Sequence, residues 1–68
     1  MDKQYTPKQA RLLAEKSQTE IAEVMGICLQ TYRKLEINPA EMTISQAKCF
    51  CSAVGRSMNE IFFGETLV

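Results

Sequence analysis

Apolar residues between positions 18 and 36 recur at the spacing of two short helices. The first apolar stripe stops at Gly26, and glycine takes a positive φ at no steric cost, which suits it to end a helix. The second stripe begins directly after it. No stretch of the chain alternates apolar and polar residues as a strand would. The apolar positions are Ile21, Ala22 and Met25 before the glycine, and Ile27, Tyr32 and Leu35 after it.

Two short helices joined by a tight corner have the spacing of a helix-turn-helix, in which the second helix is offered to the DNA major groove. Ala22 is small where the two helices would cross closely. The sequence therefore predicts that the rest of the chain holds this pair in place.

Four capping boxes, each a Ser or Thr followed three residues later by Glu or Gln, predict helix starts. Pro7 stands at the first helical position of the first helix, where its missing N–H costs nothing. The helix near 29–37 is the exception, because Cys28 occupies its cap position and cysteine is a poor N-cap. The boxes are Thr6 with Gln9, Ser17 with Glu20, Thr43 with Gln46, and Ser57 with Glu60.

These signals predict an all-α fold of five helices, near residues 7–16, 18–25, 29–37, 44–54 and 58–63. The periodicity assigns an inward-facing set to the first, fourth and fifth helices. That set is Leu12 and Leu13, then Ile44, Ala47, Phe50, Cys51 and Val54, then Met58, Ile61 and Phe62. Phe63, Leu67 and Val68 fall outside the pattern and are candidates for exposed apolar surface that meets a partner.

Length and composition fit one small globular domain, spanning residues 1–68 with a core of about 6–63 and a short tail, 64–68. Apolar residues make up 46% of the chain and charged residues 24%, which is ordinary for a folded domain. No apolar run approaches the ~20 residues that cross a bilayer. The N-terminal residues also lack the apolar region of a signal peptide. We therefore expect a cytoplasmic protein without a membrane partner.

Candidate chemistry is sparse. Three cysteines and no histidine argue against a disulfide framework or a metal site. Without histidine, paired carboxylates in one pocket or enough chain to enclose a cleft, we expect no enzyme activity and no cofactor. Eight basic and eight acidic residues give a net charge of zero. This balance counts against nucleic-acid binding, although only the charge of the docking face sets the attraction to phosphate.

Residues along most of the chain match a known pattern. The matching positions are Gln18, Ile21-Ala22, Met25-Gly26-Ile27, Leu35-Glu36, Pro39, Cys51-Ser52-Ala53-Val54-Gly55 and Ser57-Met58-Asn59-Glu60-Ile61-Phe62. Over about residues 6–63 the chain resembles the Cro/C1-type helix-turn-helix domain (XRE-like) of phage repressors and related bacterial regulators. The resemblance implies the five-helix lambda-repressor-like fold.

The resemblance also implies that the third helix lies in the major groove of double-stranded DNA. The implied DNA-contacting residues are Gln18, Cys28, Leu29, Gln30, Thr31, Arg33 and Lys34. Gln30 can read adenine bidentately and Leu29 can touch a thymine methyl. Arg33 is expected to contact a phosphate. Gln18 is expected to contact either a phosphate or a base edge. Arg11 and Glu36 match the internal ion pair of the family; the alternative is two separate surface charges.

The chain departs from the family at three places. Cys28 replaces the usual Ser or Thr. Tyr32 replaces an aliphatic residue on the buried side, with its hydroxyl expected at solvent or phosphate. The loop 37–41 lacks the usual glycine and basic residues.

The resemblance implies a sequence-specific transcriptional regulator, a Cro-like repressor that occupies an operator as a homodimer joined through the fifth helix and the tail. The alternative is a protein-interaction module of the same fold with weak or no DNA binding. The zero net charge, Glu41 and the apolar tail motivate that alternative.

Overall fold

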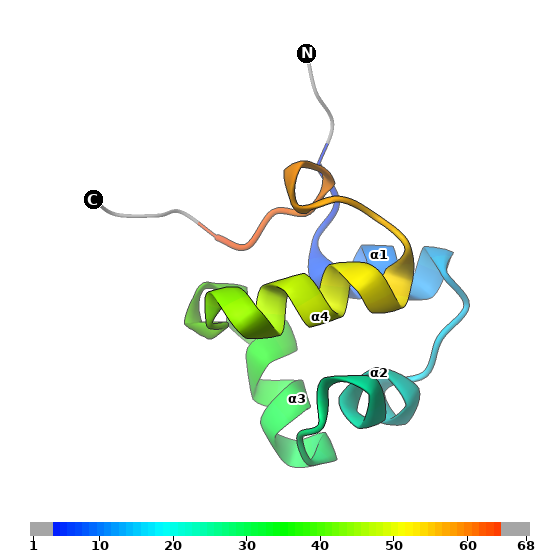
Figure 1. The fold of residues 1–68 in the computed structure, drawn as a ribbon, viewed down its shortest axis with the longest axis vertical. Coiled ribbons are helices and arrows are strands. Elements are labelled where there is room, and N and C mark those ends of the chain that lie inside the picture. Colours follow the sequence, from blue (N-terminus) through cyan, green and yellow to red (C-terminus); the bar gives the residue numbers. More distant parts are fainter. Residues whose placement is uncertain (1–3, 65–68) are drawn as a thin grey trace.

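The computed structural model describes residues 4–64, and these are mostly helical, as predicted. Helix α4 crosses the middle of the molecule, with α2 and α3 on one side of it and η2 on the other (Figure 1). Helix α2 packs against both α3 and α4. The elements are α1 (Pro7–Leu13), α2 (Gln18–Met25), α3 (Leu29–Ile37), η1 (Pro39–Glu41), α4 (Ile44–Val54) and η2 (Met58–Glu60), where η marks a short 3₁₀ helix.

The predicted capping boxes form. At the starts of α1, α2 and α4, the N–H of the third helical residue donates to the cap hydroxyl at 3.0–3.1 Å. The Glu or Gln side chain of that third residue accepts in return from the cap N–H. At the fourth box, the Ser57 N–H donates to the Glu60 carboxylate at 2.9 Å. The four starts are confirmed, although the fourth opens only a 3₁₀ turn.

Helix α1 is shorter than the predicted helix over 7–16. It ends at Leu13, and Glu15 takes a left-handed conformation with φ of 59°. The Lys16 N–H then donates to the Arg11 carbonyl at 3.1 Å, which closes the end of the helix. The sequence has no glycine or asparagine there to mark this stop.

The predicted helix over 58–63 is wrong, because η2 stops at Glu60 and Ile61 is extended. The Tyr5 N–H donates to the Glu60 carbonyl at 2.9 Å, and the Phe62 N–H donates to the Tyr5 carbonyl at 2.8 Å. These bonds form a parallel β-bridge between Tyr5 and Ile61. Tyr5, near the other end of the chain, thus makes backbone hydrogen bonds with Glu60 and Phe62 in place of those that a continued helix would have formed.

The core lies between the four α-helices and the bridge. The ring of Tyr32 stacks on that of Phe50, with centroids 6.4 Å apart and planes 20° from parallel. Most residues of the predicted stripes of α2, α3 and α4 are buried as expected, whereas Met25 and Ile27 are only partly buried against the core. The buried apolar residues are Ala10, Ile21, Ala22, Tyr32, Leu35, Ala47, Phe50, Cys51, Val54 and Ile61.

Two predicted core positions in α1 are wrong: Leu12 and Leu13 are each 56% exposed. The inward face of α1 instead carries Pro7, Ala10 and Arg11, which follow the i, i+3, i+4 spacing of one helix face. The prediction selected Leu12 and Leu13 because they are apolar, but the position that is buried after Ala10 is the charged Arg11.

Four further apolar assignments need correction. Ile44 is exposed because it is the first residue of α4 and lies a turn before the buried Ala47. Met58 and Phe62 are about two-fifths exposed, since the helical spacing fails where η2 gives way to extended chain. Phe63, expected at the surface, is partly buried against the core. Leu67 and Val68 lie outside the described residues.

Candidate nucleic-acid interface

The corner between α2 and α3 is fixed by Gly26, whose φ is +72°. The Ile27 N–H donates back to the Ala22 carbonyl at 3.0 Å, closing the end of α2. A Cβ at position 26 would meet nothing within 4 Å. The glycine is therefore required for its backbone conformation and not for space.

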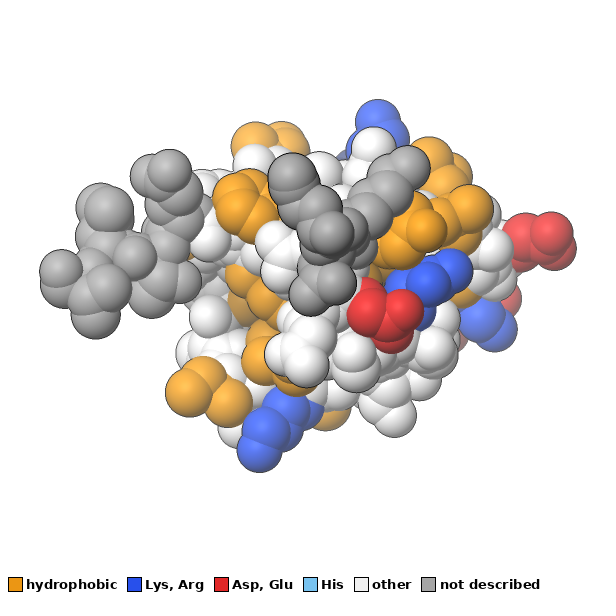
Figure 2. Space-filling model, turned by 90° about the horizontal axis from the view of Figure 1, so that it is seen from above, with side chains coloured by type: hydrophobic (Ala, Val, Ile, Leu, Met, Phe, Trp, Pro, Cys, Tyr) orange, Lys and Arg blue, Asp and Glu red, His pale blue; other side chains and the backbone are white. Residues whose placement is uncertain are grey.

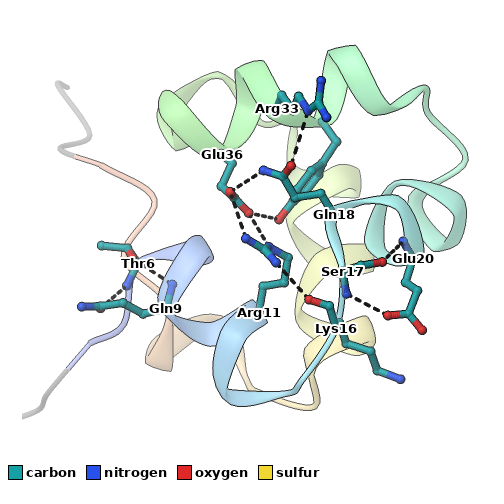
Figure 3. A network of polar contacts seen from close by, with 10 residues as sticks. Thr6, Gln9, Arg11, Lys16, Ser17, Gln18, Glu20, Arg33 and Glu36 are labelled. Carbon is teal, nitrogen blue, oxygen red and sulfur yellow. Dashed lines mark hydrogen bonds and ion pairs between the residues drawn. The ribbon is translucent and has the colours of Figure 1, made fainter.

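The far end of α3 is held by a group of polar side chains, the Glu36 network, which comprises Arg11, Gln18, Tyr32 and Glu36. Figure 3 shows Arg11 and Gln18 pointing toward Glu36. The Nε of Arg11 donates to Glu36 Oε2 at 2.7 Å, and Nη2 donates to Oε1 at 3.4 Å. The Tyr32 hydroxyl donates to Glu36 Oε2 at 2.7 Å, and Gln18 Nε2 donates to Oε1 at 2.8 Å. One carboxylate therefore joins α1, α2 and α3.

The predicted Arg11–Glu36 ion pair is thus present, and the two side chains are only 9% and 7% exposed. The alternative of two separate surface charges is wrong. Arg11 Nη1 also donates to the Lys16 carbonyl at 2.9 Å, which ties the loop before α2 to the same guanidinium.

The network keeps Glu36 ionised. Burial alone would raise the pKa of Glu36, but hydrogen bonds from Arg11, Tyr32 and Gln18 outweigh it and leave that pKa below its ordinary value. The hydrogen bond to Glu36 raises the pKa of Arg11. Burial, with the neighbouring carboxylate, raises the pKa of Tyr32. At neutral pH, Glu36 is therefore an acceptor surrounded by three donors.

Tyr32 is the network member whose role the sequence analysis missed. Its hydroxyl was expected at solvent or phosphate, but Tyr32 is fully buried and the hydroxyl reaches Glu36 instead. The signal was available, because Tyr32 and Glu36 are four residues apart and side chains at that spacing meet on a helix.

The outward face of α3, opposite the buried Tyr32 and Leu35, consists of exposed residues at intervals of three or four. Its members are Gln30, Arg33, Lys34 and Ile37. Ile37 was not among the predicted site residues, yet it is 84% exposed on this face. Its spacing of seven residues from Gln30 would have indicated it.

Cys28 and Thr31 form a separate contact at the start of α3. Cys28 is exposed and makes no cap hydrogen bond to the helix, as predicted for a cysteine at this position. Its Sγ lies 3.1 Å from Thr31 Oγ1. Hydrogen bonding from Thr31 lowers the pKa of the Cys28 thiol. Leu29, the first residue of the helix, is half-buried.

Gln18 is half-buried and not free at the surface, because its amide nitrogen donates to Glu36. Its Oε1 accepts from Arg33 Nε at 3.4 Å. The structure therefore brings the first residue of α2 together with the outward face of α3, but through an internal hydrogen bond.

The described residues also bear on two other kinds of site, a metal centre and a membrane-spanning helix. Among residues 4–64, no group of three or more Cys, Asp or Glu side chains is placed to hold a metal ion. The described helices include none long and apolar enough to cross a membrane. Compared with protein-family models, curated proteins and solved structures, the chain matches none of them.

Proposed function

We propose that α2 and α3 form a helix-turn-helix and that the protein is a sequence-specific DNA-binding transcriptional regulator that docks α3 in the major groove. The observation that carries this proposal is that one side of α3 is anchored in the protein and the opposite side is exposed. Its inner side is anchored by Tyr32, Leu35 and Glu36, while Gln30, Arg33 and Lys34 are exposed on its outward face. A rigid helix with a polar, basic outer side suits base reading and phosphate contact.

The charge on the outward face of α3 matters more than the zero net charge. Among the described residues, neither Arg33 nor Lys34 forms an ion pair, so both positive charges are available to phosphates. On the face viewed from the side of η2, by contrast, basic and acidic side chains are scattered among neutral and hydrophobic ones (Figure 2). Binding driven by local charge would therefore use α3 and not that face.

A single α3 of nine residues can read few base pairs, so the proposal includes a homodimer on two half-sites. Half-sites of such dimers lie about 34 Å apart. The molecule measures 32 × 25 × 18 Å along its principal axes, so its longest dimension is comparable to that separation. Met58 and Phe62, partly exposed around η2, are the proposed dimer surface. Blocking an operator to polymerase would then repress transcription.

One observation favours a second function, that of a protein-interaction module. Leu12 and Leu13, together with Tyr5 and Gln9, line an open hollow beside α1. Exposed leucines beside a concave surface are typical of a protein-binding site. The hollow does not overlap the outward face of α3, and the two uses are therefore compatible.

Selection from a random-sequence duplex pool, followed by binding titrations, tests the proposal. Gln30→Ala should reduce discrimination at one base by about 1 to 3 kcal/mol. Lys34→Ala should lower the salt slope of binding by about 0.9 for a lost phosphate contact. Lys48→Ala, an exposed lysine on α4, is the matched control and should leave both unchanged. Failure to enrich any sequence, with no binding at low salt, would refute DNA recognition.

A further inference from the structure

The hydrogen bonds around Gln18 form a path from the buried Glu36 network to the surface of α3. In this path Glu36 accepts from Gln18 Nε2 at 2.8 Å, and Gln18 Oε1 accepts from Arg33 Nε at 3.4 Å (Figure 3). Arg33 is exposed, and this is the side-chain hydrogen bond it makes within the described part of the chain. A buried carboxylate is thereby linked to an exposed guanidinium through one carboxamide.

Chemistry fixes the orientation of that carboxamide. An ionised carboxylate can only accept hydrogen bonds, so Gln18 must turn its NH₂ group toward Glu36. Its carbonyl oxygen then necessarily faces the other way, toward Arg33. Glu36 is itself held by Arg11 and Tyr32 at 2.7 Å each, and therefore does not swing away to release Gln18.

A phosphate is also an acceptor, so the outward-facing Oε1 of Gln18 has nothing to offer it. Arg33 does, because its guanidinium carries five N–H groups and the bond to Gln18 uses only the one on Nε. The four N–H groups on its terminal nitrogens stay available for a bidentate phosphate contact. The second hydrogen on Gln18 Nε2 is the one donor by which Gln18 could act directly.

We propose that Gln18, which is held in place by its hydrogen bond to Glu36, is a positioning residue that orients Arg33 toward a DNA phosphate. Arg33 then makes the phosphate contact. This inference rests on the proposed DNA binding and gives Gln18 a different role from the direct contact that the family resemblance implies. At 3.4 Å the bond from Arg33 is long, so it favours one orientation of the guanidinium without locking it.

A double-mutant cycle tests the inference, with the full chain and a mixed-sequence DNA duplex titrated over a range of salt concentrations. Gln18→Ala should weaken binding about two- to tenfold, the cost of ordering one long side chain. In an Arg33→Ala background, whose salt slope is already reduced by about 0.9, Gln18→Ala should have no further effect. Arg33→Lys keeps the charge but lacks Nε, so it should abolish the effect of Gln18→Ala as well.

Gln18→Ala combined with Lys34→Ala is the matched control, because the hydrogen bonds of the Gln18 side chain join it to Glu36 and Arg33 and do not involve Lys34. The effects of these two substitutions should add. If Gln18→Ala weakens binding equally with and without Arg33, then Gln18 contacts DNA itself and the inference is overturned while the proposed function stands. If the wild-type chain fails to bind the duplex, both are overturned. Melting temperatures of all variants are measured in parallel. A variant that binds weakly because it is unfolded would show a lowered melting temperature, and its loss of binding would not depend on whether Arg33 is present.

Discussion

Replacing Arg11 with methionine should destabilise the protein far more than replacing any exposed basic residue. Methionine keeps the apolar stem of arginine but removes the charge that compensates Glu36, whose side chain is 7% exposed. Breaking a buried ion pair from one side costs about 3 to 5 kcal/mol. Both side chains retain a little solvent contact, so we expect the lower end of that range, about 3 kcal/mol.

That loss is large for so small a domain. At roughly 0.05 to 0.15 kcal/mol per residue, a chain of this length has a free energy of unfolding of about 3 to 10 kcal/mol. A loss of about 3 kcal/mol should lower the melting temperature by roughly 12 to 24 °C. Urea titration and thermal unfolding followed by circular dichroism measure both quantities. Lys34→Met, at an exposed position on α3, is the control and should change stability by less than about 0.5 kcal/mol.

A triple variant separates the charge from the packing. Arg11→Met with Glu36→Leu and Tyr32→Phe removes the ion pair together with the hydroxyl that would otherwise lose its acceptor. Because exchanging a whole buried pair for apolar residues is often neutral or stabilising, this variant should be more stable than Arg11→Met alone. A loss below about 1 kcal/mol for Arg11→Met would mean that the pair behaves as an exposed one, and the central role assigned to Glu36 would be refuted.

Three further predictions concern acid stability, the corner and the weak cap. Glu36 has a folded-state pKa below its ordinary value, so the unfolded chain binds more protons and stability should fall as the pH drops below about 4.5. Urea titrations of Glu36→Gln should show a smaller fall in stability with acid. An equal fall would contradict the assignment. Gly26→Ala should lower the free energy of unfolding by about 1 to 2 kcal/mol in the same titrations, because its φ is +72°; no change would show that the corner can rearrange. Cys28→Ser should raise the melting temperature by supplying the missing cap hydrogen bond, whereas Cys28→Ala should not.

Local signals predicted most of the secondary structure, because helix starts and stops are encoded by neighbouring residues. The capping boxes and Gly26 depend on interactions within a few positions, and their outcomes agree with the sequence. The extended chain at Ile61 depends on hydrogen bonds with Tyr5, more than fifty residues earlier. No local pattern could have revealed that competition with the expected fifth helix.

The candidate site, like the secondary structure, was predicted only in part from the sequence. The Arg11–Glu36 pair came from the family resemblance, and the exposed positions of α3 came from helical spacing. The burial of Arg11 in place of Leu12 and Leu13 was not predictable from hydrophobicity, because the guanidinium is buried only by virtue of its bonds to Glu36 and Lys16. The two hydrogen bonds of Gln18, to Glu36 and from Arg33, likewise could not be predicted without knowing which amide atom faces the carboxylate.

The two ends of α3 differ in how firmly they are held, and under the proposed function this difference has a use. The end near Glu36 is tied to α1 and α2 by three hydrogen bonds to one carboxylate, which also accepts from Tyr32 within α3. The start, at Cys28, has no cap hydrogen bond and is followed by the exposed Gln30. Unsatisfied N–H groups at a helix start also favour a nearby phosphate. Under the proposed function, the end near Glu36 fixes where the helix lies, and the start presents Gln30 and the free N–H groups of the first turn to the DNA.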